Sequence, residues 1–441
     1  MKIERLPRTK RTGFSFGVRL FLCFSILVIL SQAVSLYRRG SRGDTDISVF
    51  YRTTQLLNNG IGGEVYRQRD SKTGWPISIP PAGLSIFQPL SHLSPAAATM
   101  LWALFNLGLA AASVMTLQRY FAALDQKRNL HSKIFPCAAG MFLLLASGSL
   151  QVGQYSLMFT ACWIFALYAA IGQRNYLSGF LWALPSAIKI YPALLLAAPL
   201  SLVKTIRGGV RVLLLFAAGF AVTSLLFPSL FYGLRTWELN TSFWQNTILS
   251  PESRMSEMQT LGTRANQSLD AVLLRYLSYD PNFHTKYSDV PHLNYTPETV
   301  LQFANIARLG ILFITAIAVL SWRRNGFSRS PYNLLMMAAL WSSTLYLILP
   351  ETRTRYAGYT FLAFIPLLTI ALAAKIKGDS SGYAARCAVI VVCFVLIMSF
   401  IPGSLRAFGL GFLGSLILWI ENIRLIHFLK GRAVGKGHEW D

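Results

Sequence analysis

Residues 17–37 read GVRLFLCFSILVILSQAVSLY, an apolar run whose only charged residue is Arg19. A helix of about 20 apolar residues crosses the roughly 30 Å hydrocarbon core of a bilayer, so this run predicts a transmembrane helix. Similar runs recur along the chain, which has 441 residues and is 53% hydrophobic and only 13% charged. We therefore predict an all-α integral membrane protein in which residues 1–441 form a single transmembrane domain.

The apolar runs suggest a bundle of about twelve transmembrane helices. Basic residues precede the first run, as in a signal peptide, but no small-residue cleavage signature follows Val34, so we interpret this run as an uncleaved span. Two long segments, 38–95 and 232–301, interrupt the series, and we expect both to contain short interfacial helices. The predicted spans lie near residues 17–37, 96–118, 134–150, 154–171, 176–188, 190–203, 210–231, 302–321, 332–349, 356–374, 386–401 and 405–428.

The distribution of lysine and arginine predicts the orientation, because these residues are enriched in cytoplasmic loops. The first span follows a basic segment formed by Lys2, Arg5, Arg8, Lys10 and Arg11. This places both termini in the cytoplasm, both long segments outside, and the protein in a membrane such as the bacterial inner membrane. The net charge of +23 then reflects basic inner loops that contact anionic membrane lipids, and we predict no nucleic-acid partner.

Residues 176–203 could form one long helix or two short ones. A single helix would move Lys204, Arg207 and Arg211 outside, against the charge rule. Proline also interrupts this stretch repeatedly, and proline breaks or kinks a helix interior. We therefore predict a helical hairpin with Lys189 at its outer tip.

The segment after the first span contains a candidate catalytic base. Thr45 or Asp46 is suited to cap a helix that ends near Gly60, and capping alone would explain an aspartate here. Alternatively, the carboxylate of Asp46 faces a cleft at the membrane surface and accepts a proton from an acceptor hydroxyl.

Two basic positions are candidate anion ligands. Lys189 is the only charge in its apolar stretch, and it could hold a phosphate or merely snorkel to the surface. The turn at 350–356 has two arginines, whose guanidinium groups could bind phosphate or pair with Glu351. Polar residues near other span ends complete the set. The predicted substrate-binding residues are Asp44, Tyr51, Gln154, Lys189, Asn266, Gln267, Arg353, Arg355 and Tyr356.

At these positions the sequence resembles glycosyltransferase family 87, membrane enzymes of GT-C fold that use polyprenyl-phosphate sugars. The resemblance extends over most of residues 40–370. Its motifs are Asp46 with Phe50 and Tyr51, Pro80-Pro81, Gly153-Gln154, Ile188-Lys189 with Pro192, Asn266-Gln267-Ser268, and the turn at 350–356. Members often have histidine near that turn, whereas this chain has Arg353, Arg355 and Tyr356, which leaves the sugar and the acceptor open.

The resemblance implies a GT-C bundle in which Asp46 is the catalytic base. We expect a polyprenyl-phosphate sugar donor, mannosyl transfer with inversion, and a lipid or glycan acceptor at the outer membrane face. Lys189 and Arg355 could stabilise the leaving phosphate, and the six histidines form no metal-ligand pair, so we predict no metal and no other cofactor. A transporter or flippase of lipid-linked saccharides is the alternative. Such a protein would have a through-going or alternately open central cavity.

Overall fold

The computed structural model describes residues 16–124, 131–250, 266–324, 331–349, 352–376, 382–400 and 403–435. Within these ranges the chain is all-helical and contains no β-strand, as predicted. Several residues used in the sequence analysis lie outside the described ranges, namely Lys2, Arg5, Arg8, Lys10, Arg11 and Glu351.

Each of the twelve predicted ranges overlaps a helix of the structure. Within the described ranges, seven helices are long and apolar enough to cross a membrane, which indicates a multi-pass membrane protein, and the number of twelve spans stays a prediction. These seven are α1 (Phe16–Gly40), α4 (Pro95–Leu124), α5 (His131–Val152), α9 with η4 and α10 (Ile206–Ala221, Val222–Leu226, Phe227–Tyr232), α15 (Pro297–Arg324), η6 with α17 (Thr354–Thr360, Phe361–Ile376), and α20 (Leu410–Gly435). Shorter helices accompany them: α6 (Ser156–Ile171), α7 (Asn175–Ile188), η3 with α8 (Tyr191–Leu196, Ala197–Ser201), α16 (Pro331–Ile348) and α18 (Gly382–Phe400).

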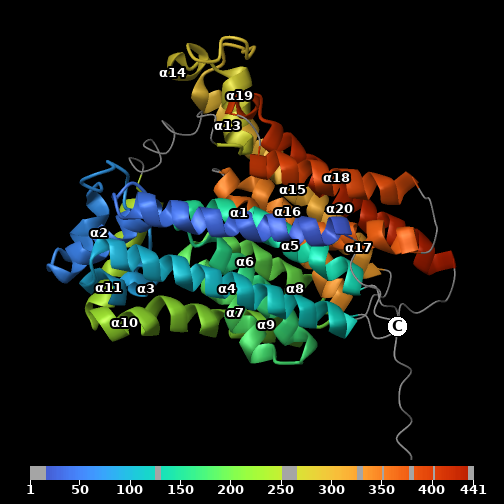
Figure 1. Ribbon diagram of the computed structural model, residues 1–441, viewed down its shortest axis with the longest axis horizontal. Helices are drawn as coiled ribbons and strands as arrows, with labels where there is room; N and C mark the ends of the chain where they lie inside the picture. The colour runs from blue at the N-terminus through green and yellow to red at the C-terminus, as the bar shows by residue number, and fades with distance from the viewer. Residues whose placement is uncertain are drawn as a thin grey trace, which may run out of the picture.

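The long helices lie side by side, with α5 in the interior (Figure 1). About 78% of the apolar window of α5 is buried, compared with 17% for the helix formed by α9, η4 and α10. Helix α5 packs against α1, α4 and η6, and α7 packs against both α6 and α9. The exposed apolar side chains of α9 and α15 have the character of a lipid-facing surface, because hydrocarbon chains are as apolar as leucine.

Short helices gather at one end of this bundle, at the left in Figure 1. They are α2 (Asp46–Asn58), η1 (Gly62–Arg67), α3 (Pro81–Phe87), η2 (Pro89–His92), α11 (Arg235–Phe243) and η5 (Trp244–Ile248). The first long segment is fastened to the second here, since Gly63 N donates to Glu238 Oε1 (3.0 Å) and Ser242 Oγ donates to Gly63 O (2.6 Å).

A second group of short helices projects at the top of Figure 1. It consists of α13 (Leu269–Leu277), α14 (Pro281–His284) and α19 (Gly403–Ala407). The predicted break at Lys189 is confirmed: α7 ends at Ile188, Lys189 has an extended backbone (φ −145°, ψ 134°), and a new helical segment begins at Tyr191.

Candidate active site

Asp46 is the first residue of α2, but its carboxylate does not serve as the cap of this helix. The capping position is Thr45, whose Oγ1 lies 3.0 Å from Ser48 Oγ. The predicted stop is also observed, since α2 ends at Asn58 and Gly60 follows in the left-handed region (φ +91°). Asp46 is 5% exposed, and its Oδ2 atom contacts side chains from two distant parts of the chain. The carboxylate of Asp46 therefore faces a buried polar group of side chains and does not cap the helix.

Gln154 contributes the first of these contacts. It lies in the tight turn between α5 and α6, where Gly153 has a positive φ of +73° and a Cβ would lie 2.8 Å from Ile47. Only glycine allows this conformation and this close approach at low cost. The turn brings Gln154 Nε2 to Asp46 Oδ2, to which it donates a hydrogen bond.

Arg355 contributes the second contact from η6. Its Nη1 donates to Asp46 Oδ2 at 2.8 Å, and the two side chains are 17% and 6% exposed. Such burial shields the ion pair from water, so it is stronger than a surface pair. The guanidinium carbon also lies 5.3 Å from the ring centroid of Tyr356.

Lys189 approaches the same ring. Its Nζ lies 4.9 Å from the ring centroid of Tyr356 and 5.7 Å from that of Tyr191. Both distances are within the range of cation–π attraction. The ring of Tyr356 is in turn stacked on that of Tyr359, with centroids 5.7 Å apart and an interplanar angle of 2°. Two cations predicted from separate motifs, Lys189 and Arg355, therefore lie over one aromatic ring.

We call the group formed by Asp46, Gln154, Lys189, Arg355 and Tyr356 the anion cluster. Five of the predicted site residues lie outside it. Asp44 is exposed and lies 3.8 Å from Lys72, and Tyr51 donates from its hydroxyl to Leu93 O at 2.7 Å. The backbone oxygen of Arg353 accepts from Tyr356 N. Asn266 and Gln267 are buried and bind backbone groups.

The sequence analysis missed two tyrosines that support the cluster. The hydroxyls of Tyr191 and Tyr359 lie 3.1 Å apart, and Ser156 Oγ donates to the Tyr359 hydroxyl at 3.3 Å. Their positions in the sequence could have indicated a role at the site, because Tyr191 follows Lys189 by two residues and Tyr359 lies one turn of η6 beyond Tyr356. Tyr191 thus contacts Lys189, and Tyr359 stacks on the ring of Tyr356 that both cations approach.

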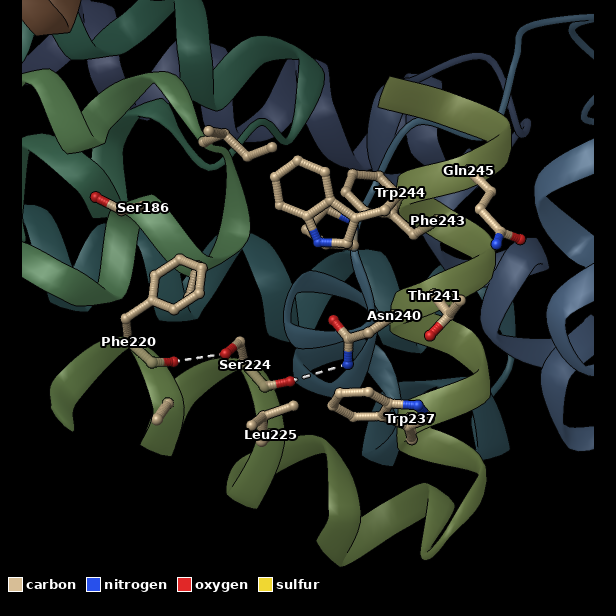
Figure 2. A pocket seen from close by; sticks show the side chains of 14 residues that line it. Ser186, Phe220, Ser224, Leu225, Trp237, Asn240, Thr241, Phe243, Trp244 and Gln245 are labelled. Atoms are coloured by element: carbon tan, nitrogen blue, oxygen red, sulfur yellow. Dashed lines mark hydrogen bonds between the residues drawn. The ribbon is translucent and has the colours of Figure 1, made fainter. Parts of the chain in front are cut away.

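A cavity of about 370 Å³ lies next to the chain that flanks Lys189, although Lys189 itself is not among the lining residues. Figure 2 shows the side chains that line it. Its wall includes Ser186, Ala187 and Ile190, which flank Lys189 along the chain. The two long walls of the cavity are largely apolar and aromatic. One is formed by Phe220, Ala221, Ser224 and Leu225 of the α9–η4 helix, and the other by Trp237, Asn240, Thr241, Phe243, Trp244 and Gln245 of α11 and η5.

Both long walls of this cavity contain a π-helical turn. Ser224 and Leu225 belong to the π-turn η4, and Trp244 and Gln245 belong to the π-turn η5. Such turns insert an extra residue into a helix and occur frequently at functional sites. Asn240 Nδ2 joins the walls by donating to Ser224 O at 3.1 Å (Figure 2).

A second buried ion pair holds the segment before α2. Arg52 donates from Nε and Nη2 to the two carboxylate oxygens of Asp70, at 2.6 and 2.7 Å, and from Nη1 to Gly43 O. Burial alone would raise the pKa of Asp70, but hydrogen bonds from Arg52 and Thr73 outweigh it and lower this pKa to about 2. The pair ties the loop around residue 70 to the residues that precede Asp46.

Within the described ranges, no three His, Cys, Asp or Glu side chains lie together in a way that could hold a metal ion. The charged groups of the cluster are one carboxylate and two cations. Such a set can bind an anion and can accept a proton.

Comparison with known proteins identifies the family of the chain. No curated protein matches the chain significantly. A sequence model of glycosyltransferase family 87 matches residues 79–350, more than half of the chain, and this segment includes Gln154 and Lys189. Arg355 lies just after the matched segment and Asp46 well before it, and the fold brings Asp46 to Gln154, which lies within the segment. The protein therefore belongs to glycosyltransferase family 87.

Proposed function

We propose that this glycosyltransferase takes mannose from a polyprenyl-phosphate donor and transfers it with inversion to a lipid-linked or cell-envelope glycan. In this proposal the reaction occurs at the outer face of a bacterial inner membrane. The supporting observation is the anion cluster, in which a buried carboxylate, Asp46, lies against Arg355 while Lys189 and Arg355 share the ring of Tyr356. Family membership favours a transferase over the transporter considered above.

The proposed reaction is a direct displacement. The acceptor hydroxyl passes its proton to the carboxylate of Asp46 while its oxygen attacks the anomeric carbon. The bond between that carbon and the phosphate oxygen breaks, and polyprenyl phosphate leaves with the electron pair. Attack opposite the leaving group inverts the anomeric configuration.

Lys189 and Arg355 are assigned to the phosphate. Cations fixed before the reaction stabilise the charge that grows on the leaving oxygen without reorganising. They can supply the positive charge for which nucleotide-sugar enzymes use a metal, so a required metal is not part of the proposal.

The ion pair between Asp46 and Arg355 adds a feature to this scheme. An incoming phosphate competes with Asp46 for the guanidinium of Arg355. Donor binding would thus release the carboxylate for its role as base, and the donor would bind before transfer begins.

The cavity beside Lys189 suits the lipid part of the donor. Its lining is dominated by aliphatic and aromatic side chains, including Phe220, Leu225 and Trp237. Burial of an isoprenoid chain is favourable by about 25 cal/mol per Å² of apolar surface. With Ile190 in its wall, the cavity could hold the first isoprene units while Lys189 binds the phosphate.

The deciding experiment measures sugar transfer by the purified protein from labelled polyprenyl-phosphate mannose to a panel of acceptors. Replacing Asp46 with Asn should lower turnover by about 10²–10⁴-fold, as expected for the loss of a general base. Donor binding should persist. Asp44→Asn is the matched control, because Asp44 lies in the same loop but is exposed and outside the cluster. Full turnover by the Asp46 variant would remove this residue as the base.

A further inference from the structure

We infer that Asn266 is a positioning residue that holds Arg355 against Asp46. The inference rests on the proposed function for its catalytic consequence, but the geometry stands by itself. Asn266 lies just before α13 and is separated from Thr352 by 86 positions in the sequence. Both residues are fully buried.

Asn266 and its neighbour bind both backbone groups of Thr352. Asn266 Oδ1 accepts from Thr352 N at 2.9 Å, and Gln267 N donates to Thr352 O at 2.5 Å. The same Oδ1 atom accepts from Ser268 N at 3.0 Å, which fixes the orientation of the amide. A backbone residue held by its N–H and its C=O together has little freedom to shift.

Thr352 begins the short segment that leads to Arg355. Only Arg353 and Thr354 lie between them, and Tyr356 N donates to Arg353 O at 2.8 Å in the first turn of η6. The guanidinium of Arg355 must then reach Asp46 Oδ2 at 2.8 Å. We therefore expect a shift of Thr352 to change this contact.

The segment behind Asn266 is itself buried and hydrogen-bonded. Arg275 is 1% exposed and donates from Nη2 to Asn266 O, and from Nη1 to Arg406 O and Ala407 O at 2.7 and 2.9 Å. Burial lowers the pKa of Arg275 to about 10, so its guanidinium remains charged at neutral pH. Asn266 thus connects a fixed framework, formed by α13 and α19, to the turn that bears Arg355.

Gln267 provides a matched control in the same segment. Its side chain is 2% exposed and bonds mainly a different region: Nε2 donates to Arg406 O at 2.9 Å, Oε1 accepts from Gly411 N at 3.1 Å, and the one contact with the tested residue is a longer bond from Nε2 to the backbone oxygen of Asn266 at 3.3 Å. Substituting Gln267 removes a buried amide of the same kind without removing the acceptor of Thr352 N.

The first test is kinetic. Asn266→Ala should lower kcat by about 10²-fold, the scale expected when a catalytic group is misplaced by about 1 Å. Asn266→Asp keeps an oxygen acceptor and should recover most of this loss. In an Arg355→Gln background, Asn266→Ala should lower kcat by no more than a further factor of about two. Gln267→Ala should lower kcat by the same factor in the Arg355→Gln background as in the wild type. If Asn266→Ala lowers kcat by the same factor with and without Arg355, the two residues act independently and the inference is overturned.

The second test does not depend on activity. Asp46→Asn removes the partner of Arg355 and should lower the thermal unfolding temperature of the full-length protein. This shift should shrink in the Asn266→Ala background and persist in the Gln267→Ala background. An equal shift in all three backgrounds would refute the positioning role. If Arg355→Gln keeps full turnover, the proposed function of Arg355 fails instead, and the unfolding data alone decide the role of Asn266.

Discussion

Nη1 of Arg355 lies 2.8 Å from Oδ2 of Asp46, although the two residues are 309 positions apart in the sequence. The contact joins the first helix of one long segment to the turn before α17. It also gives the candidate base a cation that a phosphate can compete for.

Arg355→Lys tests whether the shape of the cation matters. Lysine keeps the charge but lacks the planar fork that binds a carboxylate or phosphate through two N–H groups. We expect turnover to fall by about 10- to 100-fold, the value of one charge-assisted hydrogen bond. The measurement is kcat and donor KM. Arg67→Lys is the control, since Arg67 is exposed and bonds the side chains of Glu64 and Asn246, which lie outside the anion cluster. A similar loss in this variant would contradict the assignment of Arg355.

Lys189→Met should raise the donor KM more than it lowers kcat. The methionine keeps the apolar stem and removes the charge that we assign to the phosphate. Donor KM should rise by about 10- to 100-fold, and Lys189→Arg should recover part of this affinity. Lys72→Met is the matched control, because Lys72 is half-exposed and pairs with Asp44 outside the cluster. An unchanged donor KM in the Lys189→Met variant would exclude Lys189 as a phosphate ligand.

Ala221→Phe tests the cavity as the site of the lipid chain. Ala221 lines the cavity, and a phenyl ring there would occupy space that the chain needs. Donor KM should rise for long polyprenyl chains and change little for a short, water-soluble analogue with the same phosphate and sugar. Ala218→Phe, at an exposed position one turn earlier, should leave both values near wild type. Equal effects of Ala221→Phe on both donors would place the chain elsewhere.

Asp70→Asn should destabilise the protein in a pH-dependent way. The pKa of Asp70 is about 2 in the folded protein and 3.8 ordinarily, so the carboxylate stabilises the fold above about pH 4. This contribution is lost as the pH falls from about 4 to about 2. At pH 7 the variant should lose about 1.5–3 kcal/mol, the range for hydrogen bonds to a charged group.

The measurement for Asp70 is unfolding of wild type and variant between pH 7 and pH 3. The difference between their free energies of unfolding should become smaller below pH 4. Glu64→Gln is the control, because the Glu64–Arg67 pair is 63% exposed on both sides and surface pairs contribute little. A difference that stays constant down to pH 3 would mean that the charge of Asp70 is not what stabilises the loop.

The sequence predicted correctly those features that depend on residues adjacent in the chain. Apolar length predicts α1, and the prolines around Lys189 predict the break between α7 and η3. Predicting that Lys189 and Arg355 lie near each other required one further inference, namely that both lie at the same face of the membrane. In the structure both cations approach the ring of Tyr356. This inference followed from the charge rule, which constrains topology over the whole chain.

Other features depend on tertiary packing that no local pattern records. Asn266 and Gln267 were predicted to bind substrate, but buried amides and ligand-binding amides look the same in a sequence. Only the structure shows that their partners are Thr352, Arg406 and Gly411.

The two π-turns make the cavity depend on the number of residues as well as on their identity. Each residue advances a helix by about 100°, so one deletion within Val222–Leu226 would turn the whole of α10 about its axis relative to α9. Asn240 would then lose its partner Ser224 O. Single-residue deletions at these turns should therefore be far less tolerated than substitutions, because a deletion changes which side chains of the later helix line the cavity.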